Sequence, residues 1–140
     1  LGASNVINIS EADAVEAVHE LTEGRGANVV IVAVGTSKAA EMGIAMAGIC
    51  GTVNFFAGFY PPQTLNVDAN VIHYKQLNVT GSHDFTPHDF TSALKLIEHG
   101  TVNVKALISH RLPLEEIKQG FDTVAEQSGI KVMIEIDSAL

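Results

Sequence analysis

Three glycines stand where a backbone could receive a ligand: Gly35, Gly58 and Gly81 each follow a short run rich in β-forming residues. Each run belongs to a strand-then-helix alternation, and open α/β sheets bind ligands just beyond the carboxyl ends of their strands. Glycine at such a position lets the chain turn sharply and lets a ligand approach the backbone closely. The pattern indicates a ligand site at one edge of a sheet, although turn geometry alone also accounts for glycine there.

Side chains suited to catalysis do not form a recognisable set. None of the 6 His residues shows the H-E-x-x-H spacing, and Cys50 has no second cysteine with which to hold a metal. His83 and Asp84 could act as an acid–base pair, with two solvated loop residues as the alternative. Ser37 and Ser82 lack the G-x-S-x-G context of a nucleophile. We therefore expect no catalytic residue and no metal site in this chain.

Composition places the chain among globular proteins. It has 140 residues, of which 46% are hydrophobic and 17% charged, so a packed core is expected and disorder is excluded. The net charge of −8 argues against a nucleic-acid partner, and no apolar stretch reaches the roughly 18 residues that cross a bilayer. With Cys50 as the only cysteine there is no internal disulfide, and a reducing cytoplasm is the expected compartment.

The alternating patterns predict an α/β fold with a doubly wound parallel sheet. The expected strands are 5–9, 29–34, 52–56, 77–80, 107–112 and 131–136. The expected helices begin at a capping box over 10–13, at Thr36 or Ser37, at Thr86-Pro87 and at Pro113, with one helical turn near 70–73. Because strand 29–34 is apolar on both faces, it is expected to be central and covered by helices on each side.

Apolar spacing predicts which side chains of these helices are buried. Cys50 is expected as a small buried residue at the end of the second helix. The other residues expected to face inward are Met42, Ala45, Met46 and Ile49; Phe90, Ala93, Leu94 and Ile97; and Leu114, Ile117, Phe121 and Val124.

Taken in order along the chain, several segments resemble the later part of the zinc-dependent medium-chain alcohol dehydrogenases, and most nearly their sorbitol- and polyol-type members. The segments are 1–3, 6–8, 22–31 (TEGRGANVVI), 33–35 (AVG), 51–53, 57–59 (AGF), 106–117 (ALISHRLPLEEI), 120–121 and 129–132 (GIKV). The resemblance implies a Rossmann-like sheet that is incomplete. Residues 1–100 would be the later part of the dinucleotide-binding domain, and residues 101–140 a return segment towards the catalytic domain with a closing strand.

The resemblance also implies a set of cofactor-binding residues. The set is Val34 and Gly35 beside the adenosine half of NAD or NADP, Ala57, Gly58 and Phe59 at the nicotinamide, Ser82, His83 and Asp84 on the other wall of that pocket, and Lys131 near the phosphates. A single positive charge suits the last role, although lysine lacks the bidentate fork of arginine.

Other features of the family do not occur in this sequence. The family's G-x-G-x-x-G fingerprint, the residue that selects NAD or NADP, and the zinc ligands all lie upstream of the matching segments. The chain also begins at Leu1 without an initiator methionine. We therefore expect part of a longer enzyme, with half a dinucleotide site, weak or absent nucleotide binding alone, and zinc in the parent only. Asp84 stands where some polyol enzymes carry a basic residue, so the resemblance does not specify which substrate is used.

The parent is expected to transfer hydride between a secondary alcohol or polyol and NAD(P), and this chain is expected to be inactive alone. A missing half-sheet would expose an apolar edge and face, and segment 63–77 lies near the subunit contact in the family, so a homo-oligomer is expected. Two alternatives stay open: a zinc-free quinone or enoyl reductase relative, and a non-catalytic α/β module for binding or assembly.

Overall fold

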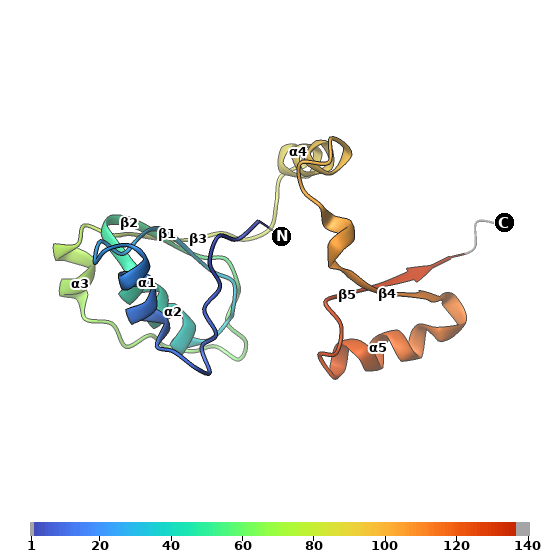
Figure 1. Ribbon diagram of the computed structural model, residues 1–140, viewed down its shortest axis with the longest axis horizontal. Helices are drawn as coiled ribbons and strands as arrows, with labels where there is room; N and C mark the ends of the chain where they lie inside the picture. The colour runs from blue at the N-terminus through green and yellow to red at the C-terminus, as the bar shows by residue number, and fades with distance from the viewer. Residues whose placement is uncertain (1, 137–140) are drawn as a thin grey trace. The chain divides into compact units, whose positions relative to one another are not determined.

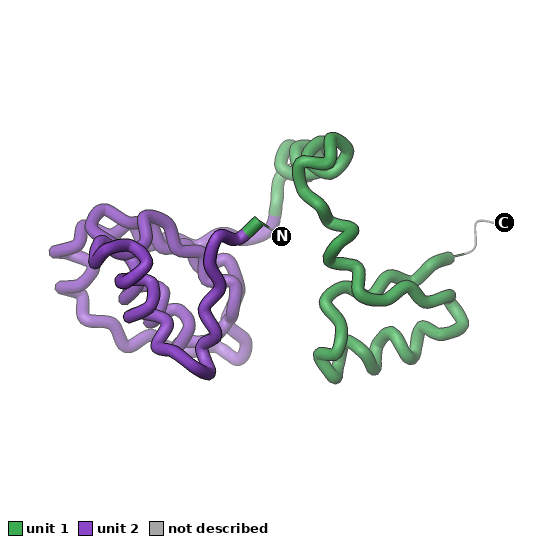
Figure 2. The backbone as a smooth tube through the Cα atoms, in the orientation of Figure 1, with its two compact units in different colours: residues 1–2, 85–140 green, residues 3–84 purple. Residues whose placement is uncertain are grey.

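The computed structural model describes residues 2–136, which form two compact units, coloured separately in Figure 2. One unit comprises residues 3–84; the other comprises residues 85–136 with Gly2. Each unit has its own parallel sheet. The boundary expected at residue 100 was inferred from a family resemblance, whereas the two units are defined by compactness. The expected boundary therefore stays a prediction.

A three-stranded parallel sheet organises residues 3–84. Its strands stand in the order β1 (Ala27–Val32), β2 (Ala47–Phe55) and β3 (Asn78–Gly81). The strands alternate with helices along the chain, as Figure 1 shows. Parallel neighbours joined through helices are the defining feature of a Rossmann-like sheet, so the predicted fold class is confirmed.

Three helices accompany this sheet: α1 (Ala14–Leu21), α2 (Ser37–Met46) and α3 (Ala69–Tyr74). α2 packs on β1 and β2, and α1 packs on α2. Thr36 begins α2 as predicted, because its hydroxyl accepts from the amide of Ala39 at 3.2 Å. α3 confirms the helical turn predicted near residues 70–73.

The core of this unit lies between α2 and the sheet. Val53 in the middle of β2 is fully buried and packs with buried residues from β1, α2, the start of β2 and the segment before β3. These residues are Val32, Ile44, Ala47 and Leu77. The alternate side chains of β1 point away from this core, with Val29 64% and Ile31 65% exposed.

β1 is an edge strand of the sheet, so its central position expected from the sequence is wrong in this structure. One face of β1 is covered by α2, while Val29 and Ile31 on the opposite face are exposed. The exposed apolar edge and face expected for an incomplete sheet are confirmed.

Two corrections concern the start of this unit. Residues 5–9 are not a strand: Val6 is 88% exposed and no ladder pairs with this segment. A strand needs a neighbour to satisfy its backbone groups, and alternation alone does not supply one. The first helix begins later than predicted, since Asp13 is its cap and accepts from the amides of Val15 and Glu16 at 2.8 and 3.0 Å.

A third correction concerns Ile49 and Cys50, which were expected at the end of a helix. α2 ends at Met46 and both residues lie in β2, where Ile49 is 73% exposed and Cys50 is exposed. Residues 48–51 form a bulge opposite Asn28, with Cys50 in the left-handed region at φ 58°. Gly48 and Gly51 are the first and last residues of this bulge, and a β-carbon on Gly48 would collide with the carbonyl oxygen of Arg25.

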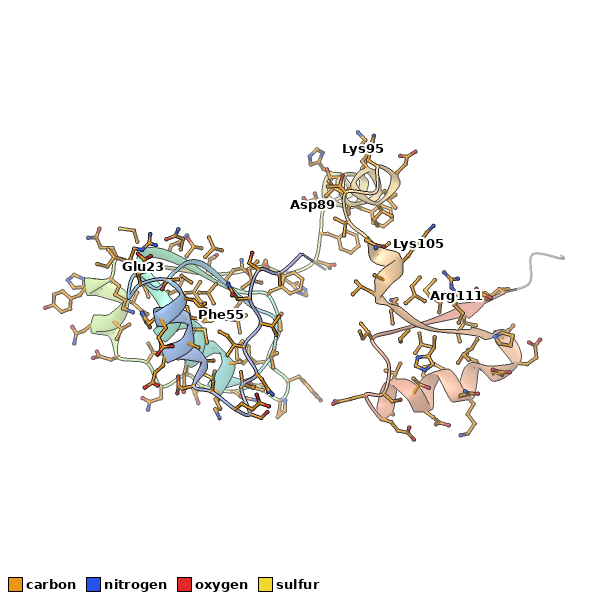
Figure 3. The ribbon with its side chains drawn as sticks, in the orientation of Figure 1. Glu23, Phe55, Asp89, Lys95, Lys105 and Arg111 are labelled. Atoms are coloured by element: carbon orange, nitrogen blue, oxygen red, sulfur yellow. The ribbon has the colours of Figure 1, made fainter. Side chains whose placement is uncertain are left out.

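The unit of residues 85–136 contains α4 (Pro87–Glu98), β4 (Ile108–Pro113), α5 (Ile117–Ala125) and β5 (Lys131–Glu135). Short 3₁₀ turns at Val104–Leu107 and Leu114–Glu116 precede β4 and α5. β4 and β5 pair in parallel, and Arg111, labelled in Figure 3, bonds Glu135 across them at 2.7 Å. None of the helices in residues 2–136 is long and apolar enough to span a membrane.

The inward faces predicted for α4 and α5 are wrong. Phe90 and Leu94 of α4 are each 51% exposed, because none of the other described helices and strands packs extensively on α4. On α5 the buried residues are Gly120 and Thr123, while Phe121 is 70% exposed. The small Gly120 brings α5 against β4 and β5, so the larger apolar side chains lie beside the contact.

Candidate functional site

The three strands of the larger unit end at one edge of their sheet. Val32 of β1 pairs with Phe55 of β2, and Phe55 pairs with Gly81 of β3. The turns that leave these strands, residues 33–35, 56–59 and 82–84, therefore emerge side by side. We call them the first, second and third turns.

The first and second turns meet through their backbones. The carbonyl oxygen of Val32 accepts from the amides of Phe56 and Ala57 at 3.1 and 3.0 Å. A β-carbon built on Gly35 would collide with the carbonyl oxygen of Gly58. Glycine is therefore required at Gly35 for this approach, whereas Gly58 has nothing within 4 Å of its own β-carbon position. The first two turns therefore come together, and the outer side of their contact at Gly58 is open.

Aromatic and aliphatic side chains flank this contact. The ring of Phe59 packs edge-on against that of Phe55, which is labelled in Figure 3, with ring centroids 6.0 Å apart. Val34, in the first turn, is 59% exposed. The second turn thus has a fixed aromatic side chain beside an open backbone at Gly58, and Val34 offers an apolar surface to the solvent.

The third turn is tied to β2 by Ser82. Its amide donates to the carbonyl oxygen of Phe55 at 3.2 Å, and its hydroxyl donates to Oδ1 of Asn54 at 3.0 Å. His83 and Asp84 follow and are exposed, with Asp84 in the left-handed region at φ 62°. The structure thus brings eight of the predicted cofactor residues to one edge, all but Lys131.

Lys131 lies in the other compact unit, as the first residue of β5. It pairs there with Ile108, and its carbonyl oxygen accepts from the hydroxyl of Ser109 at 3.2 Å. Its expected place near the cofactor phosphates stays a prediction.

Three polar residues around these turns were not predicted from the sequence. Asn54 was identifiable as the one amide side chain in the predicted strand 52–56. Gln63 and Glu41 gave no signal, because one lies in an irregular segment and the other on an exposed helix face. In the structure Gln63 bonds the start of α2 and Glu41 bonds the segment that follows Gln63.

The residues of these turns fit a dinucleotide in part and do not fit a zinc ion. Gly35 and Gly58 provide the close backbone approach that dinucleotide turns need, and the surface at Gly58 is open. Within residues 2–136, no three His, Cys, Asp or Glu side chains gather as a metal site would require. We therefore assign no metal-dependent step to these residues.

A cavity of about 350 Å³ lies along β1 and α2, beside the first turn. Its walls are mainly aliphatic, with Thr36 and Lys38 as the polar contributors. The cavity includes Ala33 and Val34 of the first turn, but no residue of the second or third turn lines it, so the candidate site is built on the turns.

Comparison with known proteins identifies the family to which the chain is similar. Residues 1–99 match the family described as zinc-binding dehydrogenases. The sorbitol dehydrogenase of Halalkalibacterium halodurans is 31% identical over 134 residues, which are 96% of this chain and 39% of that protein. The D-arabitol-phosphate dehydrogenase of Enterococcus avium is 29% identical over 135 residues, 96% of this chain and 38% of that protein.

Solved structures give the same fold. An alcohol dehydrogenase of Thermotoga maritima superposes with a TM-score of 0.88 at 21% identity, over 97% of this chain and 38% of that one. The chain thus spans less than two fifths of the length of the relatives it matches. It corresponds to the carboxyl-terminal part of zinc-dependent medium-chain dehydrogenases. On the match of residues 1–99, the chain belongs to the zinc-binding dehydrogenase family.

Proposed function

We propose that this chain forms one wall of the NAD(P) site of a polyol or secondary-alcohol dehydrogenase. The observation that carries the proposal is the contact of Gly35 with Gly58 at the aligned ends of three parallel strands, with open space at Gly58. When bound, NAD or NADP supplies a hydride acceptor at its nicotinamide ring. The chain's own part is to orient the cofactor and to exclude water from one side of it.

Each turn takes a separate role in this proposal. Val34 and Gly35 border the adenosine half, and residues 57–59 border the nicotinamide through backbone groups. Residues 82–84 form the facing wall. A polyol substrate is supported by the names of the relatives, which act on sorbitol and on D-arabitol phosphate. The acid at Asp84 brings a negative charge to that wall.

We further infer a homo-oligomer and a cytoplasmic location for the enzyme. The exposed apolar edge of β1 supports association, because unpaired strand edges bind other chains. The single cysteine supports a reducing compartment. Zinc, which the family's chemistry uses, is assigned to the whole enzyme and to none of the described residues.

The test is a titration of the ¹⁵N-labelled chain followed by amide chemical shifts. NADH should shift the amides of the first, second and third turns, with an affinity weaker than micromolar because no phosphate-binding glycine motif occurs in this sequence. Nicotinamide mononucleotide should shift residues 57–59 and 82–84, and AMP should shift Val34 and Gly35. Absence of any shift at these amides would contradict the proposal, and micromolar affinity by calorimetry would contradict the expected weakness.

A further inference from the structure

The segment that follows the second turn is fastened to α2 by two hydrogen bonds between residues distant in sequence. Oε1 of Gln63 accepts from the backbone amide of Ser37 at 2.7 Å. Oε1 of Glu41 accepts from the backbone amide of Asn66 at 2.8 Å. Ser37 and Glu41 are four residues apart, so they lie on one face of α2. The segment of residues 63–66 therefore runs along that face.

The amide that Gln63 bonds is the first of α2. The first amides of a helix have no partner within the helix and need acceptors from elsewhere. The hydroxyl of Thr36 takes the amide of Ala39, and Gln63 takes that of Ser37. An oxygen acceptor is favoured here because the helix dipole is positive at this end.

The connection from Gln63 back to the second turn is short and stiff. Only Tyr60, Pro61 and Pro62 separate Gln63 from Phe59. Each proline ring restricts its backbone φ, so the connection has little freedom to absorb a displacement of Gln63. At its other end Phe59 packs on Phe55. The second turn is thus held on one side by β2 and on the other by α2.

We propose that Gln63 is a positioning residue for the cofactor wall: its bond to Ser37 holds residues 57–59 against Gly35, with Glu41 as a second anchor. Gln63 acts through the backbone and does not itself contact the cofactor. The inference rests on the proposed function, because residues 57–59 are a cofactor wall only if the chain takes part in binding NAD(P).

Three variants separate the hydrogen bond from other effects. Gln63→Leu removes the acceptor, whereas Gln63→Glu keeps it. Ser37→Pro removes the donor at the first helical position, where proline is favoured. The preceding Thr36 is already extended, at φ −129° and ψ 147°, as a residue before proline must be. Gln119→Leu, on α5 in the other unit, is the matched control.

Amide hydrogen exchange in the complete chain is the first readout. Within residues 57–59, the amide of Ala57 donates to the carbonyl oxygen of Val32 and is therefore the protected one. Gln63→Leu and Ser37→Pro should each accelerate exchange at Ala57 about fivefold. The double variant should exchange no faster than either single variant, because both remove the same bond. Gln63→Glu and Gln119→Leu should match the wild type. Unchanged exchange at Ala57 in both single variants would overturn the proposal. If Gln63→Leu unfolds, as Val53 exchange would show, Ser37→Pro decides.

NADH titration is the second readout and separates this proposal from the proposed function. At non-saturating NADH, Gln63→Leu should reduce the shifts at residues 57–59 about fivefold, and Gln63→Glu should restore them. If wild type and Gln63→Leu respond equally, the positioning role is overturned while the cofactor site stands. If the wild type shows no shift, the cofactor site fails, and the exchange rates alone decide whether Gln63 positions the turn.

Discussion

The carbonyl oxygen of Gly58 occupies the space that a β-carbon on Gly35 would need. The two glycines belong to different strand-end turns, yet they play unequal parts. Gly35 lets the two backbones meet, whereas Gly58 faces open space. One substitution should therefore affect stability and the other ligand binding.

Gly35→Ala should destabilise the chain by about 1–3 kcal/mol, because the added methyl group must displace backbone and not a flexible side chain. Gly58→Ala is the matched control and should change stability by no more than about 0.5 kcal/mol. It should nevertheless reduce the NADH-induced shifts, since its methyl group enters the open space of the proposed site. Urea unfolding measures the first effect. Equal stability of the two variants would contradict this relationship.

The core prediction concerns Val53. Its side chain is fully buried between α2 and the sheet, so Val53→Ala should cost about 2–3 kcal/mol through lost burial and a residual cavity. Val29→Ala makes the same chemical change on β1 at a side chain that is 64% exposed, and it should cost less than about 1 kcal/mol. Thermal unfolding of both variants compares them. A cost at Val29 as large as that at Val53 would mean that the open face of β1 is covered in solution.

The capping box that begins α4 predicts a pH dependence. The hydroxyl and the amide of Thr86 both donate to the carboxylate of Asp89, at 2.6 and 2.9 Å, and they hold the pKa of Asp89 below its ordinary value of 3.8. The folded state therefore binds this proton less tightly than the unfolded state. The resulting stabilisation is present above pH 3.8 and is lost as the pH falls through the lower folded pKa.

Thr86→Ala should raise the pKa of Asp89 towards its ordinary value without reaching it, because the backbone amide remains a donor. A carboxyl NMR titration measures the change. Thr91→Ala is the control, since its hydroxyl bonds the carbonyl of Pro87 within the same helix and not Asp89. An unchanged Asp89 pKa in Thr86→Ala would show that the hydroxyl makes no difference to it.

Local sequence patterns correctly predicted helices whose caps lie within the chain. Thr86-Pro87 predicts the start of α4 because cap, proline and first-turn acid are all within four residues. The strand-then-helix alternation predicted a sheet edge at which Gly35 and Gly58 follow their strands, whereas their contact is visible only in the structure. Resemblance to a family added the roles of the turns, which no residue pattern supplies.

The failures have a common physical cause. Apolar spacing identifies the apolar face of a helix or strand, but it does not show whether another segment packs on that face. Phe90 of α4 and Ile31 of β1 have the expected pattern and are exposed, because none of the described helices and strands covers these side chains. Gln63 could not be identified, because a hydrogen bond between residues 26 apart leaves no trace in local spacing.

The carboxyl end of α2 gives a last prediction. The ammonium of Lys75 donates to the carbonyl oxygens of Ala45 and Ala47 at 3.3 and 2.8 Å, where the helix dipole is negative. Lys75→Met should therefore cost about 1–2 kcal/mol, part of which should vanish in high salt. Lys38→Met is the control. Lys38 lies exposed in the first turn of the same helix, where the dipole is positive, so its charge interacts unfavourably with the dipole. Its removal should leave stability unchanged or raise it by a few tenths of a kcal/mol. Urea unfolding at low and high salt compares the two variants, and a loss of the same size from both would show that charge at the ends of α2 does not govern its stability.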